Sequence, residues 1–348
     1  MSGSPETAAT EYAAAGVDLA RADAAKARIG RAVAGTRTPL SVGAVGAFGG
    51  MVRIPAGMRR PVLVMSTDGV GTKVLVALEA GRYDSVGEDL VNHSVNDILV
   101  HGAAPIAFMD YVAGAGLGVE ELAAIVDGVA RGCRRHGMAL AGGETAQMPG
   151  LYQPGHFDLA GTIVGVVEED AALHGERIVA GDVLLAYASS GLHTNGYTLA
   201  RRVLFDRMKL GLESRLPETG STVADALLAV HRSYVAAVSP VLARVHGIAH
   251  ITGGGIAGNL ARILPPGTAA TVDARSWDLP PLFRVLQQGG ALSTAEMREV
   301  FNLGVGLIVV LPPEAVEAAR EAAAADGVTT WVMGEIVPGA QTVGFAPA

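Results

Sequence analysis

The sequence predicts a two-domain protein of the α/β class. Its 348 residues are enough for two cores, and a composition of 50% apolar and 17% charged residues is globular, not disordered. Apolar runs such as 61–65 predict buried strands, and they alternate with segments of helical periodicity such as 119–136. We expect a frayed segment 1–15, an N-terminal domain over 16–170 that ends in the acidic run 168–170, and a C-terminal domain over 171–348.

In the N-terminal half, a predicted helix over 20–33 leads into 42–50, where glycine recurs every third residue. That density is too high for a packed strand or helix, so we expect a mobile loop over phosphate, or else a loose edge before the strand at 61–65. The elements predicted next are a helix over 87–101, a strand over 105–112, a helix over 119–136, a short strand over 138–141 and a long strand over 157–167.

In the C-terminal half, a strand over 182–188 runs through the polar turn 189–197 into a helix over 198–205. Helices are expected near 223–230 and 233–245, followed by a second polar turn at 250–255 and a helix through 259–264. The remaining predicted elements are strands near 270–273 and 303–311, a helix over 313–325 and a strand over 330–336.

Charge and cysteine content restrict the function. A net charge of −8 without any run of Lys or Arg argues against nucleic-acid and anionic-membrane partners. Cys133, the only cysteine, shares helical spacing with Leu122, Ile125, Val126 and Val129, which predicts a core thiol and not a nucleophile. No apolar run reaches about 18 residues and no signal-peptide pattern is present, so we expect a cytoplasmic protein.

The segment 66–73 (STDGVGTK) follows the strand at 61–65 and begins a helix. Gly69 and Gly71 permit close backbone approach to a ligand, and the N–H groups of a helix start favour an anion. The carboxylate of Asp68 would repel a phosphate unless a cation lay between them, so Asp68 and Lys73 together suggest a metal–phosphate site. The alternative is an ordinary strand-to-helix turn with Asp68 as N-cap.

Two further segments offer carboxylates. Asp89, His93, Asn96 and Asp97 share one face of the helix over 87–101, which we interpret as a binding wall, with a solvated face as the alternative. Glu144 follows two glycines at the end of the strand at 138–141. Carboxylates about 4 Å apart repel by roughly 4 kcal/mol at an effective dielectric of about 20. If Asp68, Asp97 and Glu144 converge, they need a cation, and Mg²⁺ suits oxygen ligands.

Two polar glycine turns suit an anion without a charged side chain. The first, 189–197 (SSGLHTNGY), places hydroxyls, an amide and glycines between a strand and a helix; an Asn-Gly turn with Ser and Thr caps is an equal alternative. The second, 250–255 (HITGGG), places His250 beside three glycines at a helix start. We give a structural histidine and a ligand-facing one equal weight.

The chain resembles the phosphoribosylformylglycinamidine cyclo-ligase family, also called aminoimidazole ribonucleotide (AIR) synthetase. The resemblance is carried, in the family's order, by 15–18 (AGVD), 67–73, 95–97 (VND), 142–146 (GGETA), 148–150 (MPG), 189–197, 250–255 and 301–306 (FNLGVG). It implies an AIR-synthetase-like fold of two α/β domains in a homodimer. The N-terminal sheets of two subunits would pair into a barrel, with the sites near the dimer interface.

The resemblance also implies an ATP-dependent ligase of purine biosynthesis. ATP would activate the formyl-amide oxygen of formylglycinamidine ribonucleotide, an amidine nitrogen would attack, and phosphate would leave to give 5-aminoimidazole ribonucleotide and ADP. Phosphorylation is needed because an amide oxygen is a poor leaving group, and catalysis then depends on positioning and charge neutralisation.

The implied site residues form four groups. Catalysis is expected from His250, Asp97 and Lys73, and Mg²⁺ binding from Asp68, Asp97 and Glu144. ATP binding is expected from Gly43, Gly46, Gly49, Gly50, Asp68, Gly69, Gly71, Thr72, Lys73, Asn96, Asp97, Gly143, Glu144 and Thr145. The substrate phosphate is expected at Ser189, Ser190, Gly191, His193, Thr194, Asn195, Gly253, Gly254 and Gly255.

Three positions depart from the family pattern. Gly30 stands where members often carry lysine after Arg-Ile, and Gln147 where they commonly carry glutamate, so neither receives a ligand role. His93 replaces a small or sulfur-bearing residue, and the sequence offers no account of it.

Two rival interpretations remain at the sequence level. A selenophosphate synthetase or hydrogenase-maturation enzyme on this scaffold would need a cysteine that this chain lacks at the relevant place, and the phosphate cradle at 189–197 disfavours a thiamine-monophosphate kinase. The other rival is a nucleotide-binding regulatory protein without turnover.

Overall fold

The computed structural model describes residues 19–44, 46 and 48–346. The segment 1–15 and the motif at 15–18 therefore lie outside the described residues. No helix among the described ones is long and apolar enough to cross a bilayer.

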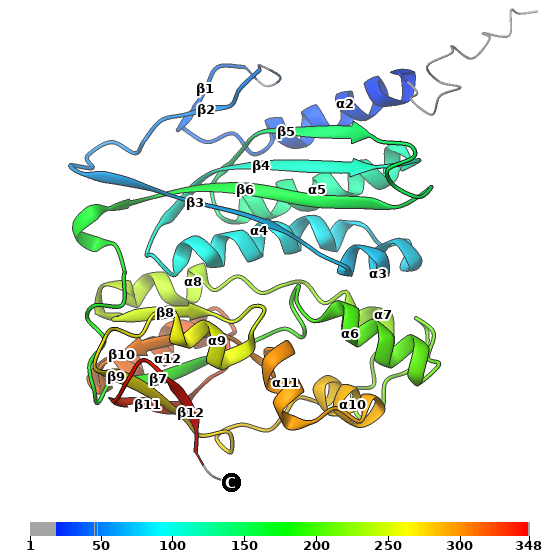
Figure 1. Cartoon of the computed structure of the whole chain (residues 1–348). Helices are drawn as coiled ribbons and strands as arrows, with labels where there is room; N and C mark the ends of the chain where they lie inside the picture. Colours follow the sequence, from blue (N-terminus) through cyan, green and yellow to red (C-terminus); the bar gives the residue numbers. More distant parts are fainter. Residues whose placement is uncertain (1–18, 45, 47, 347–348) are drawn as a thin grey trace, which may run out of the picture.

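The N-terminal half is a four-stranded sheet with helices on one face (Figure 1). Across the sheet the order is β3 (Pro61–Gly69), β6 (Phe157–Glu168), β4 (Ala104–Gly114) and β5 (Ala139–Gln147). β4 and β5 are parallel, and the other neighbours are antiparallel. α4 (Asp84–Leu99) and α5 (Val119–Arg135) pack together behind the sheet, and α2 (Leu19–Ala34) packs on α5. The short α3 (Lys73–Ala80) follows β3, and β1 (Ser41–Val42) and β2 (Met51–Val52) form a hairpin beside β5.

The other face of this sheet presents exposed apolar side chains. Met65 and Leu63 on β3 are 65% and 46% exposed, and Met109 and Tyr111 on β4 are each 38% exposed. The strand predicted as buried at 61–65 is thus an edge strand with one open face, which corrects that prediction. A run of β-branched residues signals extended backbone, but it does not reveal whether the chain itself covers both faces.

The C-terminal half is a six-stranded sheet covered on both faces. The strand order is β12 (Val343–Phe345), β9 (Thr268–Val272), β11 (Thr330–Pro338), β7 (Val183–Ala188), β10 (Val305–Leu311) and β8 (Gly247–His250). α8 (Val235–Val238) and α12 (Val316–Ala325) share a core with one face, and α9 (Gly255–Ala261) with the other. The remaining helices are α6 (Tyr197–Arg201), which continues as a π-helical segment over Arg202–Arg207, α7 (Val223–Leu227), α10 (Pro281–Gly290) and α11 (Thr294–Val300).

α4 lies between the four-stranded sheet and the C-terminal half (Figure 1). For this reason its polar residues Asp89, Asn92, His93 and Asn96 are buried, although they stand on the face opposite its apolar stripe. The binding wall that we predict on this helix therefore faces the other half of the molecule and not bulk water.

Several element predictions need adjustment. The strand predicted at 138–141 continues to Gln147, so Gly143 and Glu144 lie within β5 and not in a turn. Asp68 belongs to β3 and the next helix begins at Lys73 with Thr72 as N-cap, so Asp68 is not an N-cap. The short elements β8, β12, α10 and α11 were not predicted. The domain boundary that we predict at residue 170 falls between β6 and β7.

Candidate active site at the junction of the two halves

Two of the three predicted metal ligands meet where α4 faces the C-terminal half. Ser66 Oγ on β3 donates to Asp68 Oδ2 at 2.7 Å and lies 3.5 Å from Asp97 Oδ2 in the last turn of α4. His93 Nε2 lies 3.4 Å from a carboxylate oxygen of each aspartate. The side chains of Asp68 and Asp97 are 27% and 25% exposed, so a ligand can reach both.

His93 supplies a positive charge between these two carboxylates. Burial disfavours its charged form, but the hydrogen bonds to Asp68 and Asp97 outweigh burial and raise the pKa of His93 to about 9. The repulsion between the two carboxylates is offset by the protonated ring. From the sequence we expected a metal ion to do this. This accounts for a histidine at a position where the sequence alone offered no explanation.

His250, at the end of β8, forms a pair with Asp97. Its Nδ1–H donates to Asp97 Oδ1 at 2.7 Å. Burial lowers the pKa of His250, although Asp97 opposes the shift. Burial also resists ionisation of Asp97, but hydrogen bonds from His250 and His93 hold the pKa of Asp97 below its usual value. A neutral imidazole that donates from Nδ1 to a carboxylate keeps its lone pair at Nε2, which here faces His231 Nε2 at 3.2 Å.

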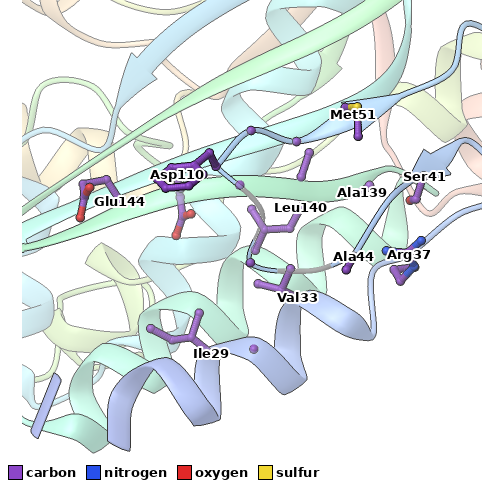
Figure 2. Close-up of a pocket in the computed structure, with 18 of the residues that line it drawn as sticks. Ile29, Val33, Arg37, Ser41, Ala44, Met51, Asp110, Ala139, Leu140 and Glu144 are labelled. Carbon is purple, nitrogen blue, oxygen red and sulfur yellow. The ribbon is translucent and has the colours of Figure 1, made fainter. Parts of the chain in front are cut away.

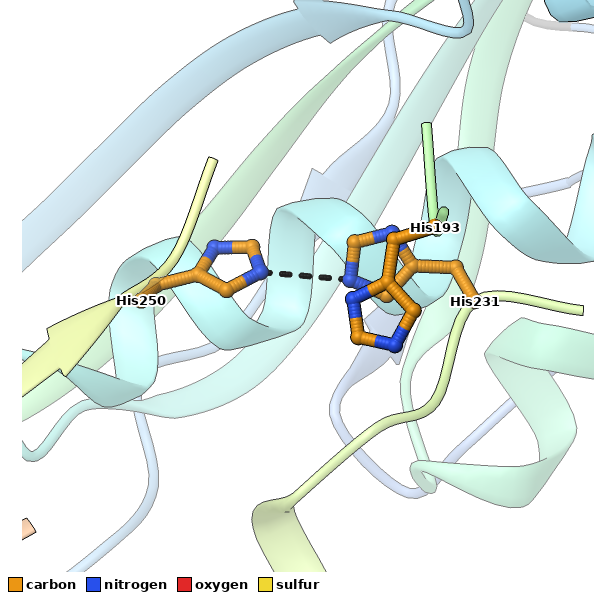
Figure 3. A group of neighbouring side chains, drawn as sticks. All are labelled: His193, His231 and His250. Atoms are coloured by element: carbon orange, nitrogen blue, oxygen red, sulfur yellow. Dashed lines mark hydrogen bonds between the residues drawn. The ribbon is translucent and has the colours of Figure 1, made fainter. Parts of the chain in front are cut away.

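Asp97 and His250 belong to a closed ring of polar contacts that also includes His231, Thr194 and His93. His231 Nε2 lies 3.2 Å from His250 Nε2 (Figure 3), and His231 Nδ1 lies 3.3 Å from Thr194 Oγ1. Thr194 Oγ1 in turn lies 2.7 Å from His93 Nδ1, which completes the circuit back to Asp97. His231 was missed because it stands alone between α7 and α8, where no local motif distinguishes it from a structural histidine.

Ring nitrogens of His193, His231 and His250 lie within 4.8 Å of one another, as three metal ligands would (Figure 3). However, His193 and His231 are stacked, with ring centroids 3.9 Å apart and planes 21° apart. The lone pair of an imidazole nitrogen lies in the ring plane, so nearly parallel rings do not direct two lone pairs at one ion. We therefore assign no metal to the three histidines.

The ammonium group of Lys73 is enclosed in a buried ion pair. Its side chain is fully buried, and Nζ pairs with Asp89 Oδ2 at 2.8 Å and donates to the carbonyls of Ala229 (2.7 Å) and His193 (3.3 Å). These three partners match the three N–H donors of an ammonium group. The phosphate and catalytic roles expected of Lys73 are corrected to a buried ion pair that links α3 and α4 to the C-terminal half.

Glu144 lies away from the other two carboxylates within one chain. Asp68 pairs with Gly161 on β6, Gly161 with Asp110 on β4, and Asp110 with Gly143, the neighbour of Glu144. Three strand spacings amount to roughly 14 Å. The Glu144 carboxylate instead accepts the N–H of Thr145 at 2.9 Å. The convergence of Asp68, Asp97 and Glu144 that we predict does not occur within one chain.

Glu144 lines a cavity of about 400 Å³ between α2, β5 and the hairpin of β1 and β2, which we call the glycine hairpin (Figure 2). Gly46, Gly49 and Gly50 line it on the hairpin side, and Gly143 and Thr145 on the β5 side. Gly43 and Gly46 adopt positive φ of 78° and 88°, which allow the hairpin to fold over the strand. Gly30 on α2 also lines this cavity, and Gln147 lines an adjoining one.

The first predicted phosphate cradle faces the turn after β3. Gly71 and Thr72 line a cavity of about 500 Å³ together with Thr194 and Asn195. The Nδ2 atom of Asn195 is buried and has no hydrogen-bond partner among the described residues, so it is a donor available to a ligand. Arg202 lines the same cavity and was missed, because an arginine on a helix carries no signal of its own.

Other predicted residues hold the backbone in place. The hydroxyl of Ser189 donates to Gly191 O at 3.0 Å and that of Ser190 to Val230 O at 2.6 Å. His193 has a positive φ of 62°, and its Nε2 accepts the N–H of Ser190 at 3.2 Å. Such strain in a non-glycine residue is common at functional sites.

The second predicted turn begins α9 beside the first one. A Cβ at Gly253 would lie 3.6 Å from Asn195 Oδ1, which shows how near the two turns are. Gly254 is the N-cap with φ 90°, and a Cβ at Gly255 would lie 1.9 Å from Arg298 O, so these positions need glycine. Asn96 ties the halves together, because Oδ1 accepts the N–H of Tyr234 at 3.0 Å and Nδ2 donates to Arg232 O at 2.9 Å.

The fold agrees with comparisons with known proteins. Residues 50–167 match the family model "AIR synthase related protein, N-terminal domain", and residues 179–346 match its C-terminal counterpart. Among solved structures, a thiamine-monophosphate kinase from Stenotrophomonas maltophilia K279a superposes with a TM-score of 0.66 at 20% identity, over 92% of this chain and 95% of that one. Hydrogenase maturation protein HypE of E. coli superposes with a TM-score of 0.63 at 17% identity, over 94% of each chain. At such identities these two structures establish the fold alone.

Curated relatives are far more similar in sequence. The phosphoribosylformylglycinamidine cyclo-ligase of Sorangium cellulosum is 49% identical over 94% of this chain and 95% of its own length. The cyclo-ligase of Thermosynechococcus vestitus is 44% identical over 97% and 99%. At this identity and coverage, the chain belongs to the phosphoribosylformylglycinamidine cyclo-ligase family.

Proposed function

We propose that this protein catalyses the ATP-dependent cyclisation of formylglycinamidine ribonucleotide to 5-aminoimidazole ribonucleotide, with release of ADP and phosphate, in the cytoplasm. The observation that carries the proposal is the identity of 44–49% with cyclo-ligases along nearly the whole chain. The Asp97–His250 pair at the junction supports it, because ring closure requires a group that moves a proton.

The reaction needs two bond changes at one carbon. The γ-phosphoryl group of ATP is transferred to the formyl-amide oxygen, which turns that oxygen into a good leaving group. The amidine nitrogen then attacks the same carbon, a C–N bond forms, and phosphate departs with the oxygen. The ring nitrogen must also lose a proton. His250 suits this step, because Asp97 orients its ring and can stabilise the imidazolium that forms.

Asp68 and Asp97 fit a magnesium ion with ATP. Both are partly exposed carboxylates close to Ser66 Oγ, and Mg²⁺ prefers one or two carboxylates together with water and phosphate oxygens. Bound there, the ion would neutralise charge on the transferred phosphoryl group. His93 would then give up part of its contact with the two carboxylates.

The ribose phosphate of the substrate fits the cavity between the turn after β3 and the segment 194–202. The unpartnered Asn195 amide, the hydroxyl of Thr72 and the guanidinium of Arg202 are all donors suited to a phosphate. We assign Lys73 to the support of this cavity and not to its ligand contacts.

We further propose a homodimer in which two copies cover the open face of the four-stranded sheet. Leu63, Met65, Met109 and Tyr111 form an apolar patch there that water would otherwise contact. Within one chain, the cavity at Glu144 and the carboxylate of Asp68 are separated by three strand spacings. In a dimer, the Glu144 cavity of one copy could instead lie beside Asp68 of the other copy. The nucleotide would then contact both copies.

The purified protein, supplied with formylglycinamidine ribonucleotide and Mg²⁺–ATP, should produce ADP and aminoimidazole ribonucleotide in equal amounts. His250→Asn and Asp97→Asn should each reduce kcat by roughly 10²-fold to 10⁴-fold, the usual contribution of a positioned acid or base. His174→Asn, which alters an exposed histidine, is the matched control. Formation of ADP only with thiamine monophosphate, or ATP binding without product under every condition, would refute the proposal.

A further inference from the structure

Two imidazole rings from different halves of the molecule point at the carboxylate of Asp97. His93 stands one helical turn before Asp97 on α4, and its Nε2 lies 3.4 Å from Asp97 Oδ2. His250 ends β8, and its Nδ1 lies 2.7 Å from Asp97 Oδ1. One nitrogen of each ring and one carboxylate oxygen lie within 4.8 Å of one another. Small side-chain movements therefore bring all three around one ion with bonds of about 2.0–2.2 Å.

The orientation of these two rings suits a common ion. The planes of His93 and His250 are 75° apart, with ring centroids 5.2 Å apart, whereas the rings of His193 and His231 are nearly parallel. The lone pair of an imidazole nitrogen lies in the ring plane, and both rings turn a nitrogen toward the same carboxylate. An ion beside that carboxylate would lie near the direction of both lone pairs.

The second nitrogen of each ring has a partner that holds the ring in place. His93 Nδ1 lies 2.7 Å from Thr194 Oγ1, and His250 Nε2 lies 3.2 Å from His231 Nε2. Histidines that bind metal ions usually donate their other N–H to such a partner, which fixes the ring orientation. His231 Nε2 can accept this hydrogen while His231 Nδ1–H donates to Thr194 Oγ1 at 3.3 Å. The surrounding contacts thus remain satisfied when both rings bind an ion.

The chemistry of these ligands differs from that of a magnesium site. Imidazole suits Zn²⁺ and other first-row transition-metal ions, whereas Mg²⁺ prefers oxygen. Two histidines and one carboxylate, with a fourth position open, are a common ligand set for Zn²⁺. The side chain of Asp97 is 25% exposed, so an ion can enter from its side. His93 departs from the family pattern, so membership of the family does not by itself imply this site.

We propose that His93, Asp97 and His250 bind a first-row transition-metal ion such as Zn²⁺, and that this ion inhibits the protein. The ion replaces the hydrogen at His93 Nε2, and His250 binds through Nδ1 in the tautomer whose Nε2–H faces His231. It occupies the Asp97–His250 pair that we assign to proton transfer and withholds Asp97 from Mg²⁺. The inhibition rests on the proposed function, whereas the binding site does not.

The test measures Zn²⁺ binding to chelator-treated protein without nucleotide. Calorimetric titration of the wild-type protein should show one Zn²⁺ per chain, bound more tightly than Mg²⁺. X-ray absorption at the zinc edge should show two imidazole ligands with Zn–N distances of about 2.0–2.1 Å. Thr194→Val, which removes the partner of His93, should weaken Zn²⁺ binding roughly 10-fold to 100-fold, and His93→Leu should weaken it further. His174→Leu, which alters an exposed histidine, is the matched control.

A kinetic measurement tests the inhibition. Zn²⁺ should slow cyclisation by the wild-type protein in the presence of Mg²⁺–ATP, and a zinc-selective chelator should restore the rate. Whatever activity His93→Leu retains should resist Zn²⁺ at the concentration that inhibits the wild-type protein. Cyclisation at the full rate with the site occupied would overturn the inhibition.

The outcomes separate the two proposals. Zn²⁺ bound no more tightly than Mg²⁺, or a zinc-edge spectrum without imidazole ligands, would overturn the site and requires no variant. A His93→Leu protein that melts normally and binds Zn²⁺ as the wild-type protein does would also overturn it. If Zn²⁺ binds through His93 but the zinc-free protein forms no aminoimidazole ribonucleotide, the proposed function fails while the metal site stands.

Discussion

At the residue scale, Lys73 shows how local sequence can mislead about charge. A lysine that ends a glycine turn after a strand invites a phosphate role. In the folded protein its ammonium group is enclosed by Asp89 and two carbonyl oxygens. Burial lowers the pKa of Lys73 and raises that of Asp89, while their mutual attraction opposes both shifts. The pair is retained because each group would be costly without the other.

Lys73→Met should therefore destabilise the protein without a selective effect on ATP affinity. Removal of one partner leaves the Asp89 carboxylate buried and uncompensated, which typically costs about 3–5 kcal/mol. Chemical denaturation monitored by circular dichroism measures this loss. The double variant Lys73→Met/Asp89→Leu should recover a large part of it. A stable Lys73→Met protein with a greatly raised KM for ATP would restore the phosphate role.

His136, which caps α5, provides a pH-dependent contribution to stability. Its Nε2 lies 3.2 Å from Asn92 Oδ1, and burial, with help from Arg135, lowers the pKa of His136 to about 4. The unfolded chain binds this proton near pH 6.5, whereas the folded protein binds it near pH 4. The contribution of His136 to stability should therefore be constant above about pH 6.5 and fall as the pH drops from there to 4.

We expect the effect to amount to at most about 3.4 kcal/mol between those limits, because the two pKa values differ by about 2.5 units. Urea denaturation of the wild-type protein and of His136→Gln at a series of pH values measures it. The variant should lose that part of the acid dependence and keep the rest. Identical profiles for the two proteins between pH 4 and 6.5 would contradict the assignment.

At the element scale, the hairpin of β1 and β2 depends on contact with β5. A Cβ at Gly50 would lie 2.3 Å from the carbonyl oxygen of Ala141, so the two backbones touch. The glycine spacing of this segment was visible in the sequence. Its partner strand was not, because nothing in 139–147 signals that a hairpin about 90 residues earlier will lie on it.

Gly50→Ala should move the hairpin away from β5 and weaken nucleotide binding. Overpacking of this kind costs about 1–3 kcal/mol, which corresponds to a rise of roughly 10-fold in the KM for ATP. Steady-state kinetics with ATP as the varied substrate measures it, and a thermal melt verifies the fold. Gly344→Ala on β12, where a Cβ meets nothing within 4 Å, serves as the control. An unchanged KM would show that the hairpin does not take part in ATP binding.

At the scale of the whole molecule, the open sheet face determines the expected assembly. Interfaces of stable complexes bury about 1,200–2,000 Å² in total, and a four-stranded sheet with exposed Leu, Met and Tyr side chains provides a suitable centre for one. The same face carries no helix of its own chain in the described structure (Figure 1).

Met65→Lys should convert a dimer into a folded monomer, because it places an unpaired charge on that apolar face. Sedimentation equilibrium or light scattering measures the mass, and circular dichroism verifies the fold. Val332→Lys changes an apolar side chain of β11 that is 46% exposed and should leave the mass unchanged. A wild-type protein that is monomeric at micromolar concentration would refute the dimer.

The sequence by itself determined most of the strand and helix order, the α/β class, the family and the residues that offer ligand chemistry. Periodicity, glycine turns and motif order are local properties, so they can be read without coordinates. Asp68, Asp97 and His250 were among those residues, and the structure brings them together. Cys133 was expected in the core and is buried there.

Only the tertiary structure decided which of those groups meet. Glu144 and Lys73 are separated from the carboxylate pair by strand order and by burial, and neither property is encoded in the residues next to them. His93 and His231 gained their roles because α4 is enclosed between the two halves, which surrounds its polar side chains with partners from distant segments. Which remote segments lie side by side depends on how the entire chain packs, and a local stretch of sequence does not contain that information.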